Sequence, residues 1–448
     1  MCAARIRFIR IYHQFTEAEC KLIRALLLHN NGKAFLPSLK QFYCAANRQD
    51  APLVASFGLP SIDILHLMQL RVHQTVLYHT GPLQVTPFLR TLVVDRAWPH
   101  NDDVKLPIVD ITLLFKHLRC LKTYYGQVGP SELKRLEISP ILEELDLHVI
   151  GFESWRSPLH LPKIQRLCIT GTPGNISALI SHLHSPLLTH FEAFIKAKCY
   201  TNVAQCIRGI SSTLFGVTLR SLKLRINILP IGSARKDEIL KRSTTTLSSL
   251  LGPSFSMAKL EVLALEGPTI APYYITTTHH DISTVAQGLK HLRSISLTDI
   301  MYLYEPLSLQ LTPDRVVRLL GSTRCIALVT VLQHITCYCP QLVELELDKL
   351  HIEVPESADL PLPTQTSDDG HALSAASSAT NHPLRLLSLR YLNTGRYRFT
   401  DPVVIAEYLN RLFPYLDLVH MRRETPISHI KGGWNAVLDG LAARRRRR

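Results

Sequence analysis

The sequence of 448 residues predicts an α/β solenoid, a curved array with parallel strands on its concave face and helices on its convex face. Three observations predict this fold. A short apolar phrase recurs along the chain, proline often stands at a fixed position before it, and helix-forming stretches lie between its copies. Together they describe a unit of strand, turn and helix that is repeated about a dozen times.

The recurring phrase is an apolar residue, two variable positions, an apolar residue, one variable position and a further apolar residue. Clear copies span residues 142–147, 164–169 and 342–347. The last two apolar residues alternate with polar ones, which is the pattern of a half-buried strand. We call the first apolar residue of each copy its marker, and the markers are Leu39, Ile62, Leu89, Leu142, Ile164, Leu188, Leu219, Leu260, Leu292, Leu342, Leu384 and Leu416. The gap after Leu89 has room for one degenerate copy near Leu118 and Leu121.

Proline stands two residues before eight of these markers, where it ends a preceding helix and needs no backbone donor. These prolines are Pro37, Pro60, Pro87, Pro140, Pro162, Pro186, Pro340 and Pro414. The shortest steps between markers are 22 to 24 residues, inside the roughly 20–29-residue period of leucine-rich repeats. The predicted fold class is therefore a leucine-rich-repeat solenoid; ordinary α/β units in a compact domain are the alternative.

Helix signals lie between the predicted strands, and two segments interrupt the rhythm. Helices are expected after Asp401-Pro402, after Thr312-Pro313 and over 175–184. Loop insertions without a core pattern are expected near 230–254 and 356–382. The predicted organisation is a helical cap or remnant over 1–34, irregular repeats over 35–425, and a C-terminal cap with an arginine tail over 426–448, including a closing helix near 434–441.

Composition excludes several classes of protein. Apolar residues make up 46% of the chain and charged residues only 19%, which excludes a disordered chain. No run approaches the roughly 18 apolar residues of a membrane span, and the N-terminal arginines do not fit a secretory signal. Ten cysteines in this length are too sparse for a disulfide framework and favour a reducing compartment, so a cytoplasmic or nuclear location is expected, with no membrane partner.

The phrase around Cys339-Pro340 and Leu342 resembles the cysteine–proline variant of the leucine-rich repeats in F-box proteins. Residues 36–39 and 412–416 also resemble the large fungal group of such proteins, and the resemblance covers about 35–421. It implies a substrate receptor of a cullin-based ubiquitin ligase, in which F-box helices hold a small adaptor and the repeats hold the target. The first 35 residues show no F-box, so an adaptor is expected only if an F-box lies upstream.

Two groups of residues have a composition suited to metal binding or catalysis. His334, Cys337 and Cys339 lie close together, but zinc usually takes four such ligands, and buried cysteines are the favoured reading. His279-His280-Asp281 lies in a threonine-rich segment predicted to be a loop, where chance adjacency among 21 histidines explains it.

Other motifs of catalysis are missing from the sequence. No glycine-rich phosphate loop and no nucleophile elbow occur. Cys199 and Cys206 are expected in the core. The sequence predicts no enzyme, no metal and no cofactor.

The variable positions within the strands are the candidate binding residues, because side chains alternate between the two faces of a strand. The side chains expected on the concave face are Glu144, Asp146, His148, Arg166, Lys223, Arg225, Glu344, Glu346 and Asp348. Acidic and basic patches of this kind suit a protein or peptide partner of mixed charge. Solvated strand faces without a ligand remain the alternative.

The chain ends in an arginine run and has a net charge of +14, of which the run supplies five charges. The run comprises Arg444, Arg445, Arg446, Arg447 and Arg448. It is compatible with nuclear import or nucleic-acid binding, but a flexible tail without a partner is favoured because no aromatic residues interleave it.

The sequence thus predicts a non-catalytic protein-binding repeat domain, the recognition part of an F-box-type ligase receptor. A non-ligase scaffold is the alternative, and a basic nucleic-acid-associated protein is less favoured.

Overall fold

The computed structural model describes most of the chain's repeats. Described residues are 5–11, 16–30, 36–45, 61–68, 89–95, 117–139, 141–213, 218–229, 244–268, 274–303, 332, 338–348, 351–353, 382–388, 403, 406–407, 409–410, 413–424 and 433–446. The chain divides into two units: unit 1 comprises Met1–Phe194 and Thr213–Thr218, and unit 2 comprises Ile195–Ser212 and Leu219–Arg448.

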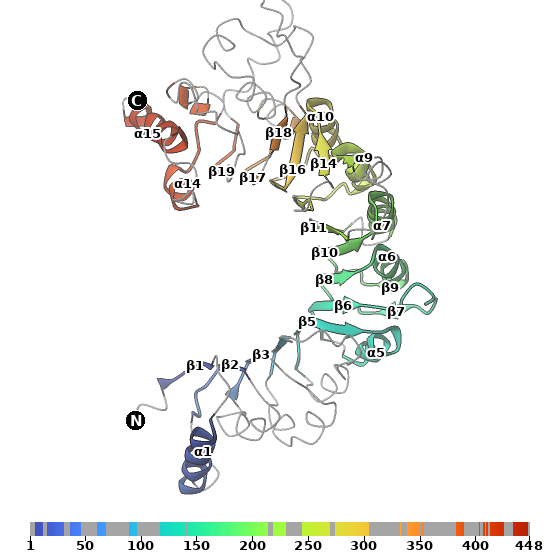
Figure 1. Ribbon diagram of the computed structural model, residues 1–448, viewed down its shortest axis with the longest axis vertical. Helices are drawn as coiled ribbons and strands as arrows, with labels where there is room; N and C mark the ends of the chain where they lie inside the picture. Colours follow the sequence, from blue (N-terminus) through green and yellow to red (C-terminus); the bar gives the residue numbers. More distant parts are fainter. Residues whose placement is uncertain are drawn as a thin grey trace, which may run out of the picture. The chain divides into compact units, whose positions relative to one another are not determined.

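Unit 1 is built on parallel strands that follow one another in chain order (Figure 1). These are β1 (Phe8–Ile11), β2 (Gln41–Ala45), β3 (Ile64–Met68), β4 (Thr91–Asp95), β5 (Cys120–Val128), β6 (Glu144–Val149), β8 (Arg166–Gly171) and β10 (His190–Ala197), whose last residues belong to unit 2. The helices are α1 (Glu17–His29), α5 (Pro130–Arg135) with a 3-10 turn (Leu136–Ile138), and α6 (Pro173–His182). A short pair, β7 (Leu159–His160) and β9 (Leu183–His184), connects two repeats on the helical side.

Unit 2 continues the same pattern and adds a second sheet. Its large-sheet strands are β11 (Ser221–Ile228), β13 (Val262–Glu266), β15 (Ser294–Thr298), β17 (Glu344–Asp348) and β19 (Leu386–Ser388). The second sheet pairs β12 (Thr244–Thr246), β14 (Tyr274–Thr277), β16 (Ile300–Leu303) and β18 (His351–Glu353) in parallel. The helices are α7 (Tyr200–Ser212), α9 (Leu247–Leu251) with a 3-10 turn (Gly252–Ser256), α10 (His279–Gly288), α14 (Leu418–Glu424) and α15 (Gly433–Arg446). No helix in the described residues is long and apolar enough to cross a membrane.

A tight turn brings the chain into each strand. The marker N–H donates to the carbonyl three residues earlier: 3.0 Å from Leu39 to Leu36 and 3.1 Å from Leu342 to Cys339. Proline occupies the second position of these turns, where its fixed φ is favoured. The proline that ends the helix therefore also preforms the turn.

The residue after each marker joins successive repeats through its backbone. The Lys40 carbonyl accepts N–H groups from Asp63 at 2.9 Å and Ile64 at 3.0 Å. The carbonyls that accept two N–H groups from the next repeat in the same way are those of Asp63, Arg90, Arg119, Glu143 and Gln165 in unit 1, and Arg220, Glu261, Arg293 and Val343 in unit 2. Each strand therefore begins in the same register as the strand before it.

The strands bury every second side chain beneath the helices. In β6, Leu145, Leu147 and Val149 are buried and alternate with half-exposed residues. In β8, Gly171 lies against Ile176 of α6, which is 3.4 Å from the place where a Cβ would stand. Helices α5 and α6 in unit 1, and α7, α9 and α10 in unit 2, lie on this buried side of the large sheet (Figure 1). We call the opposite side, which bears the alternating side chains, the open face.

The predicted fold class is confirmed by this strand–helix repeat. Eleven predicted copies, those with markers from Leu39 to Leu384, carry strands of the large sheet, and all their markers are buried. The degenerate copy near Leu118 and Leu121 is β5.

Two expected boundaries differ at the ends of the array. The repeats do not begin at residue 35, because β1 precedes α1 and pairs with β2. The copy at Leu416 keeps the buried marker and the turn, but helix α14 follows in place of a strand. The Asp417 side chain accepts the N–H groups of Val419 and His420, both at 3.0 Å, and so caps that helix.

The helix expected over 175–184 is shifted towards the N-terminus. Thr172 caps α6 and Pro173 occupies its first turn, so the helix begins earlier than predicted. It ends at His182 because Leu183 and His184 pair as β9.

The loop expected near 230–254 is ordered in its second part. Residues 244–256 form β12, α9 and a 3-10 turn, and Leu247, Leu250 and Leu251 are buried. These leucines have helical spacing, but the threonines and serines around them are typical of a loop, so the sequence predicted a loop here. Residues 230–243, most of the 356–382 insertion, the segment after Thr312 and most of 401–409 lie outside the described residues.

In unit 2, Gly267 lies so close to the backbone of Asp299 that adding a methyl group there should destabilise the fold. A Cβ on Gly267 would stand 2.4 Å from the Asp299 carbonyl, and Asp299 is itself held at a φ of 56°. We expect Gly267→Ala to lower the free energy of unfolding by about 1–3 kcal/mol, because the backbone must shift to admit the methyl group.

The matched control is Gly252→Ala, since a Cβ there meets nothing within 4 Å. It should change stability by less than about 1 kcal/mol. Urea unfolding followed by circular dichroism measures both variants, and equal losses would contradict the close approach.

Candidate functional site

The open face of unit 1 carries four of the predicted binding residues. Glu144 and Asp146 of β6 are half-exposed, and Arg166 of β8 is exposed beside them. His148, the third predicted residue of β6, is half-exposed and stands opposite Gln127 of β5. Strand pairing thus brings together side chains that are separated by about one repeat in the sequence.

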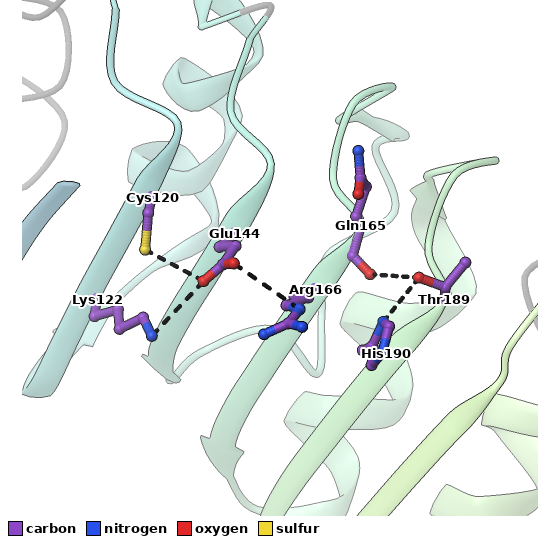
Figure 2. A network of polar contacts seen from close by, with 7 residues as sticks. All are labelled: Cys120, Lys122, Glu144, Gln165, Arg166, Thr189 and His190. Carbon is purple, nitrogen blue, oxygen red and sulfur yellow. Dashed lines mark hydrogen bonds and ion pairs between the residues drawn. The ribbon is translucent and has the colours of Figure 1, made fainter. Parts of the chain in front are cut away.

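Glu144 is the centre of a polar network across three strands (Figure 2). One of its carboxylate oxygens lies 3.7 Å from Lys122 Nζ and accepts a hydrogen bond from Cys120 Sγ at 3.5 Å. The other lies 3.9 Å from Arg166 Nε. Two cations therefore hold this carboxylate across the strands, although each ion pair is partly solvated and contributes only about 1 kcal/mol or less.

Asp146 has a different electrostatic environment from its neighbour Glu144. Burial raises the pKa of the Asp146 carboxyl, and the negative charge of Glu192 on β10 acts in the same direction. A hydrogen bond with Cys168 and the charge of Lys122 oppose this rise in pKa. Burial is therefore the main cause of the raised pKa of Asp146, and Lys122 and Glu192 act on its carboxyl in opposite directions.

In unit 2 the predicted residues form a basic strand and an acidic strand. Lys223 and Arg225 are exposed on β11, and Arg225 lies 3.4 Å from Glu266 of β13. On β17, Glu344 is exposed and Glu346 accepts a hydrogen bond from Ser296 at 2.8 Å.

These two groups of predicted residues do not meet in the sheet. Strands β13 and β15 separate β11 from β17. Asp348 is the last residue of β17 and pairs with Thr298, but the structure does not describe its side chain.

Charge-based reasoning missed an aromatic row at the start of unit 1. The Tyr43 ring lies 5.3 Å from Phe8 and 5.0 Å from His66, both edge to face. The Arg10 guanidinium stands 4.7 Å above the Tyr43 ring centre. The alternation of Phe8, Ile9, Arg10 and Ile11 is visible in the sequence, but it lies before the first predicted repeat at residue 35.

A second missed feature is a ladder of charges at the residue after the marker. Lys40 lies 3.8 Å from Asp63 in unit 1, and Arg220 lies 3.3 Å from Glu261 in unit 2. Arg119 and Glu143 repeat this arrangement at 3.4 Å. Opposite charges at equivalent positions of successive repeats were the available sequence signal.

Cys339, one member of the metal candidate, is buried at the turn before Leu342. His334 and Cys337 lie outside the described residues. His382 is buried beside Cys339: its Nδ1 accepts the Leu384 N–H at 3.2 Å, and its Nε2 lies 2.9 Å from the Cys339 carbonyl. The ring therefore links two repeats in its neutral form, with hydrogen on Nε2. Within the described part of the chain, no cluster of three or more histidine, cysteine or acidic side chains is arranged to hold a metal.

His279-His280-Asp281 begins helix α10 and does not lie in the predicted loop. Thr278 caps the helix, and Asp281 accepts the Thr278 N–H at 3.0 Å in a reciprocal capping box. The buried Asp281 carboxylate also accepts a hydrogen bond from Ser248. Capping of the helix and its attachment to α9 account for this aspartate.

The arginine run is partly incorporated into the C-terminal cap. Arg444 to Arg446 form the last residues of α15. Arg444 pairs with Glu407 at 2.9 Å, and Arg445 donates to the Leu416 carbonyl at 2.5 Å. Arg447 and Arg448 lie outside the described residues.

The chain-ordered parallel sheet, the turn at each marker and the helices on one face define the fold class as a leucine-rich-repeat solenoid. No protein-family model and no curated protein matches the sequence. Solved structures do match, including a chain of the yeast Rad7 and Elc1 complex at 16% identity and a TM-score of 0.40, covering 92% of this chain and 85% of that one.

Two further matches come from other organisms. A chain of the Drosophila Toll–Spatzle complex has 13% identity and a TM-score of 0.35, covering 80% of this chain and 38% of that one. An internalin (InlF) of Listeria monocytogenes has 13% identity and a TM-score of 0.32, covering 81% and 78%. The fold class follows from the strand order and the repeat.

The environment of His382 predicts a pH-dependent stability. Burial lowers the pKa of His382 below its ordinary 6.5, while its hydrogen bond with Cys339 acts in the opposite direction. The unfolded chain therefore binds the proton more readily, so the stabilising contribution of neutral His382 is present above about pH 6.5 and is lost as pH falls below it.

Urea unfolding between pH 5 and 8 should show a shallower pH dependence for His382→Gln than for the wild type. The control, His420→Gln, removes an exposed histidine of α14 and should keep the wild-type slope. Parallel curves for all three proteins would contradict the neutral His382 link.

The buried cysteines are expected to react slowly with alkylating reagents in the native protein. Burial raises the pKa of Cys120, Cys206 and Cys339 to about 12 each, so few thiolates form at pH 8. Iodoacetamide should label these three at least about tenfold more slowly than the half-exposed Cys199 in the native protein, and equally in urea. Mass spectrometry of tryptic peptides measures the rates, and fast native labelling of Cys206 would contradict the packing.

Proposed function

We propose that this protein is a non-catalytic protein-binding repeat protein that recognises its partner with the open face of the large sheet. The observation that carries the proposal is the chemistry of this face. Its side chains alternate with the buried core, and on β5, β6 and β8 they are charged groups linked across strands. A polar surface on a rigid parallel sheet is suited to a protein or peptide of mixed charge.

The ion pairs support this function by ordering side chains before binding. Glu144 is held between Lys122 and Arg166, and Arg225 is held by Glu266. Side chains fixed in advance lose less conformational entropy when a partner docks. The same cross-strand pairing contributes little to folding stability, since exposed ion pairs are worth about 1 kcal/mol or less.

The finer proposal is that the partner is the target of an F-box-type cullin ubiquitin ligase, with this chain as the recognition part of the receptor. The cysteine–proline repeat phrase at Cys339 and Pro340 supports it. The turn formed there, with Cys339 buried and its carbonyl bonded to Leu342, explains why this residue pair suits a repeat junction. A non-ligase scaffold with the same repeats is the alternative.

Partner binding is tested with a phage-displayed library of random twelve-residue peptides selected on the immobilised full chain. We expect enriched peptides, and we expect Glu344→Lys with Glu346→Lys, or Glu144→Lys with Asp146→Lys, to reduce their binding at least about tenfold, because each pair reverses charge on an open face. Glu17→Lys, an exposed charge reversal on α1, is the control. No enrichment over uncoated beads, or losses equal to those of the control, would contradict the proposal.

The ligase proposal is tested by pull-down of the purified ligase adaptor with the chain from Met1 to Arg448 and with any version extended upstream of Met1. Capture by either form supports the receptor function. Failure of both would leave the non-ligase scaffold as the function.

A further inference from the structure

We infer that the edge of the large sheet at β1 binds an extended strand of a protein partner, in which acidic side chains alternate with apolar ones. The strand docks parallel to β1 and continues the sheet beyond it. This inference goes beyond the proposed function, because it uses the edge of the sheet and the exposed core of the first repeat rather than the open face.

Residues 6–11 are a further copy of the recurring phrase, with Ile6 as its marker and Ile9 and Ile11 as its apolar strand residues. The Arg7 carbonyl accepts two N–H groups from the start of the second repeat, at 2.8 and 3.0 Å. The first repeat is therefore joined to the second through the same junction that joins the later repeats.

The apolar side chains of this first copy are incompletely buried. Ile6 is 38% exposed, whereas the marker of the next copy, Leu39, is 0% exposed. Ile9 is half-buried, whereas Phe42, its partner on β2, is fully buried. Solenoids usually cover the core of a terminal repeat with a cap. The first repeat therefore presents core surface that one more strand can bury.

Two backbone donors of the first repeat lie on the side of β1 that faces away from β2. In the later junctions, the N–H groups of the residue after the marker and of the next residue donate to the preceding repeat, as Asp63 and Ile64 do to Lys40. Arg7 and Phe8 hold these two positions in the first repeat, and no described strand lies beyond β1. A parallel strand added there would supply the carbonyl that both N–H groups require.

The last strand of the large sheet, in unit 2, shows how such an edge is covered by the chain itself. Helix α14 packs against β19, and the Asp417 N–H donates to the Arg385 carbonyl at 2.6 Å. No segment within the described ranges covers β1 in this way, and Phe8 on this strand is 48% exposed. The edge at β1 is therefore the one that has room for a strand from outside.

The charges at this edge favour an acidic partner. In later repeats, opposite charges stand next to each other at the residue after the marker, as Arg119 and Glu143 do at 3.4 Å. In the first repeat this residue is Arg7, and its neighbour in the second repeat is Lys40, which is also basic. The charged side chains of residues 5–11 are exposed and all basic: Arg5, Arg7 and Arg10. An acidic side chain in register with Arg7 would restore the alternation of charge.

A second copy of this chain is less well matched to the edge. Its own β1 segment would bring three further arginines to the contact, and like charges a few ångströms apart repel. The phrase that matches the edge has acidic residues in register with Arg7 and Arg10, and apolar residues in register with Ile6, Ile9 and Ile11.

Two fluorescently labelled peptides of opposite charge test the inference on the full chain by fluorescence polarisation. The acidic peptide has the sequence of residues 139–150, which contains the phrase of β6 and three acidic side chains. The control peptide has the sequence of residues 216–227, which contains the phrase of β11 and three basic side chains. We expect the acidic peptide to bind at least about tenfold more tightly than the control peptide.

Charge reversal at the edge should exchange this preference. Arg7→Glu with Arg10→Glu should weaken binding of the acidic peptide at least about tenfold and strengthen binding of the control peptide. The matched control is Lys163→Glu with Arg208→Glu, which reverses two exposed cations outside β1 and should leave the preference unchanged. Failure of the acidic peptide to bind, equal binding of both peptides, or equal effects of the two double variants would overturn the inference.

Hydrogen–deuterium exchange followed by mass spectrometry locates the docked peptide. We expect slower exchange over residues 5–11 when the acidic peptide is added, because the N–H groups of Arg7 and Phe8 become hydrogen-bonded. Slower exchange confined to β5, β6 and β8 would place the peptide on the open face, which overturns the inference and leaves the proposed function standing.

Sedimentation velocity without peptide examines the other occupant of the edge. We expect a monomer at all concentrations. A concentration-dependent dimer that Arg7→Glu with Arg10→Glu changes would assign the edge to a second copy of this chain and overturn the inference.

Discussion

The structure depends on one backbone interaction, the pair of hydrogen bonds that each repeat receives from the next. A single carbonyl, such as that of Lys40 or Glu261, accepts two N–H groups at the start of the following strand. The marker turn directly before it fixes the direction of the chain, and proline preforms many of these turns. The strand register, the buried leucine row and the open face all follow from this junction, because a shift of one residue would exchange the two faces.

The same constraint separates the buried residues of each strand from the partly exposed ones. Every second residue of a strand, such as Leu145 or Leu147, is buried beneath the helices and contributes to the hydrophobic free energy of folding. Residues at the alternate positions, such as Glu144 and Asp146, remain partly exposed and contribute little to folding. The aromatic row of Phe8, Tyr43 and His66 is an exception on the open face, because its rings pack against one another while Phe8 stays 48% exposed.

The sequence was sufficient to predict the repeat because its signal is local. A marker, a proline and two alternating apolar residues identify a strand without knowledge of its neighbours, and β5 was found even in degenerate form. The copy at Leu416 was wrong because Asp417 provides a helix cap that outweighs the apolar alternation. Contacts across strands, such as Tyr43 with Phe8 or Lys122 with Glu144, depend on register between segments of variable spacing, and spacing alone does not reveal them.

The junction carbonyl also affects how the chain can change in length. Leu292 and Leu342 are fifty residues apart, whereas Leu142 and Ile164 are 22 apart, yet both pairs of repeats meet through the same two hydrogen bonds. The junction uses backbone atoms of a few residues, so the length of chain between repeats enters only through loop-closure entropy, which grows slowly with length. New segments, including second-sheet strands such as β16, can therefore be acquired between repeats without altering the registered strands on either side.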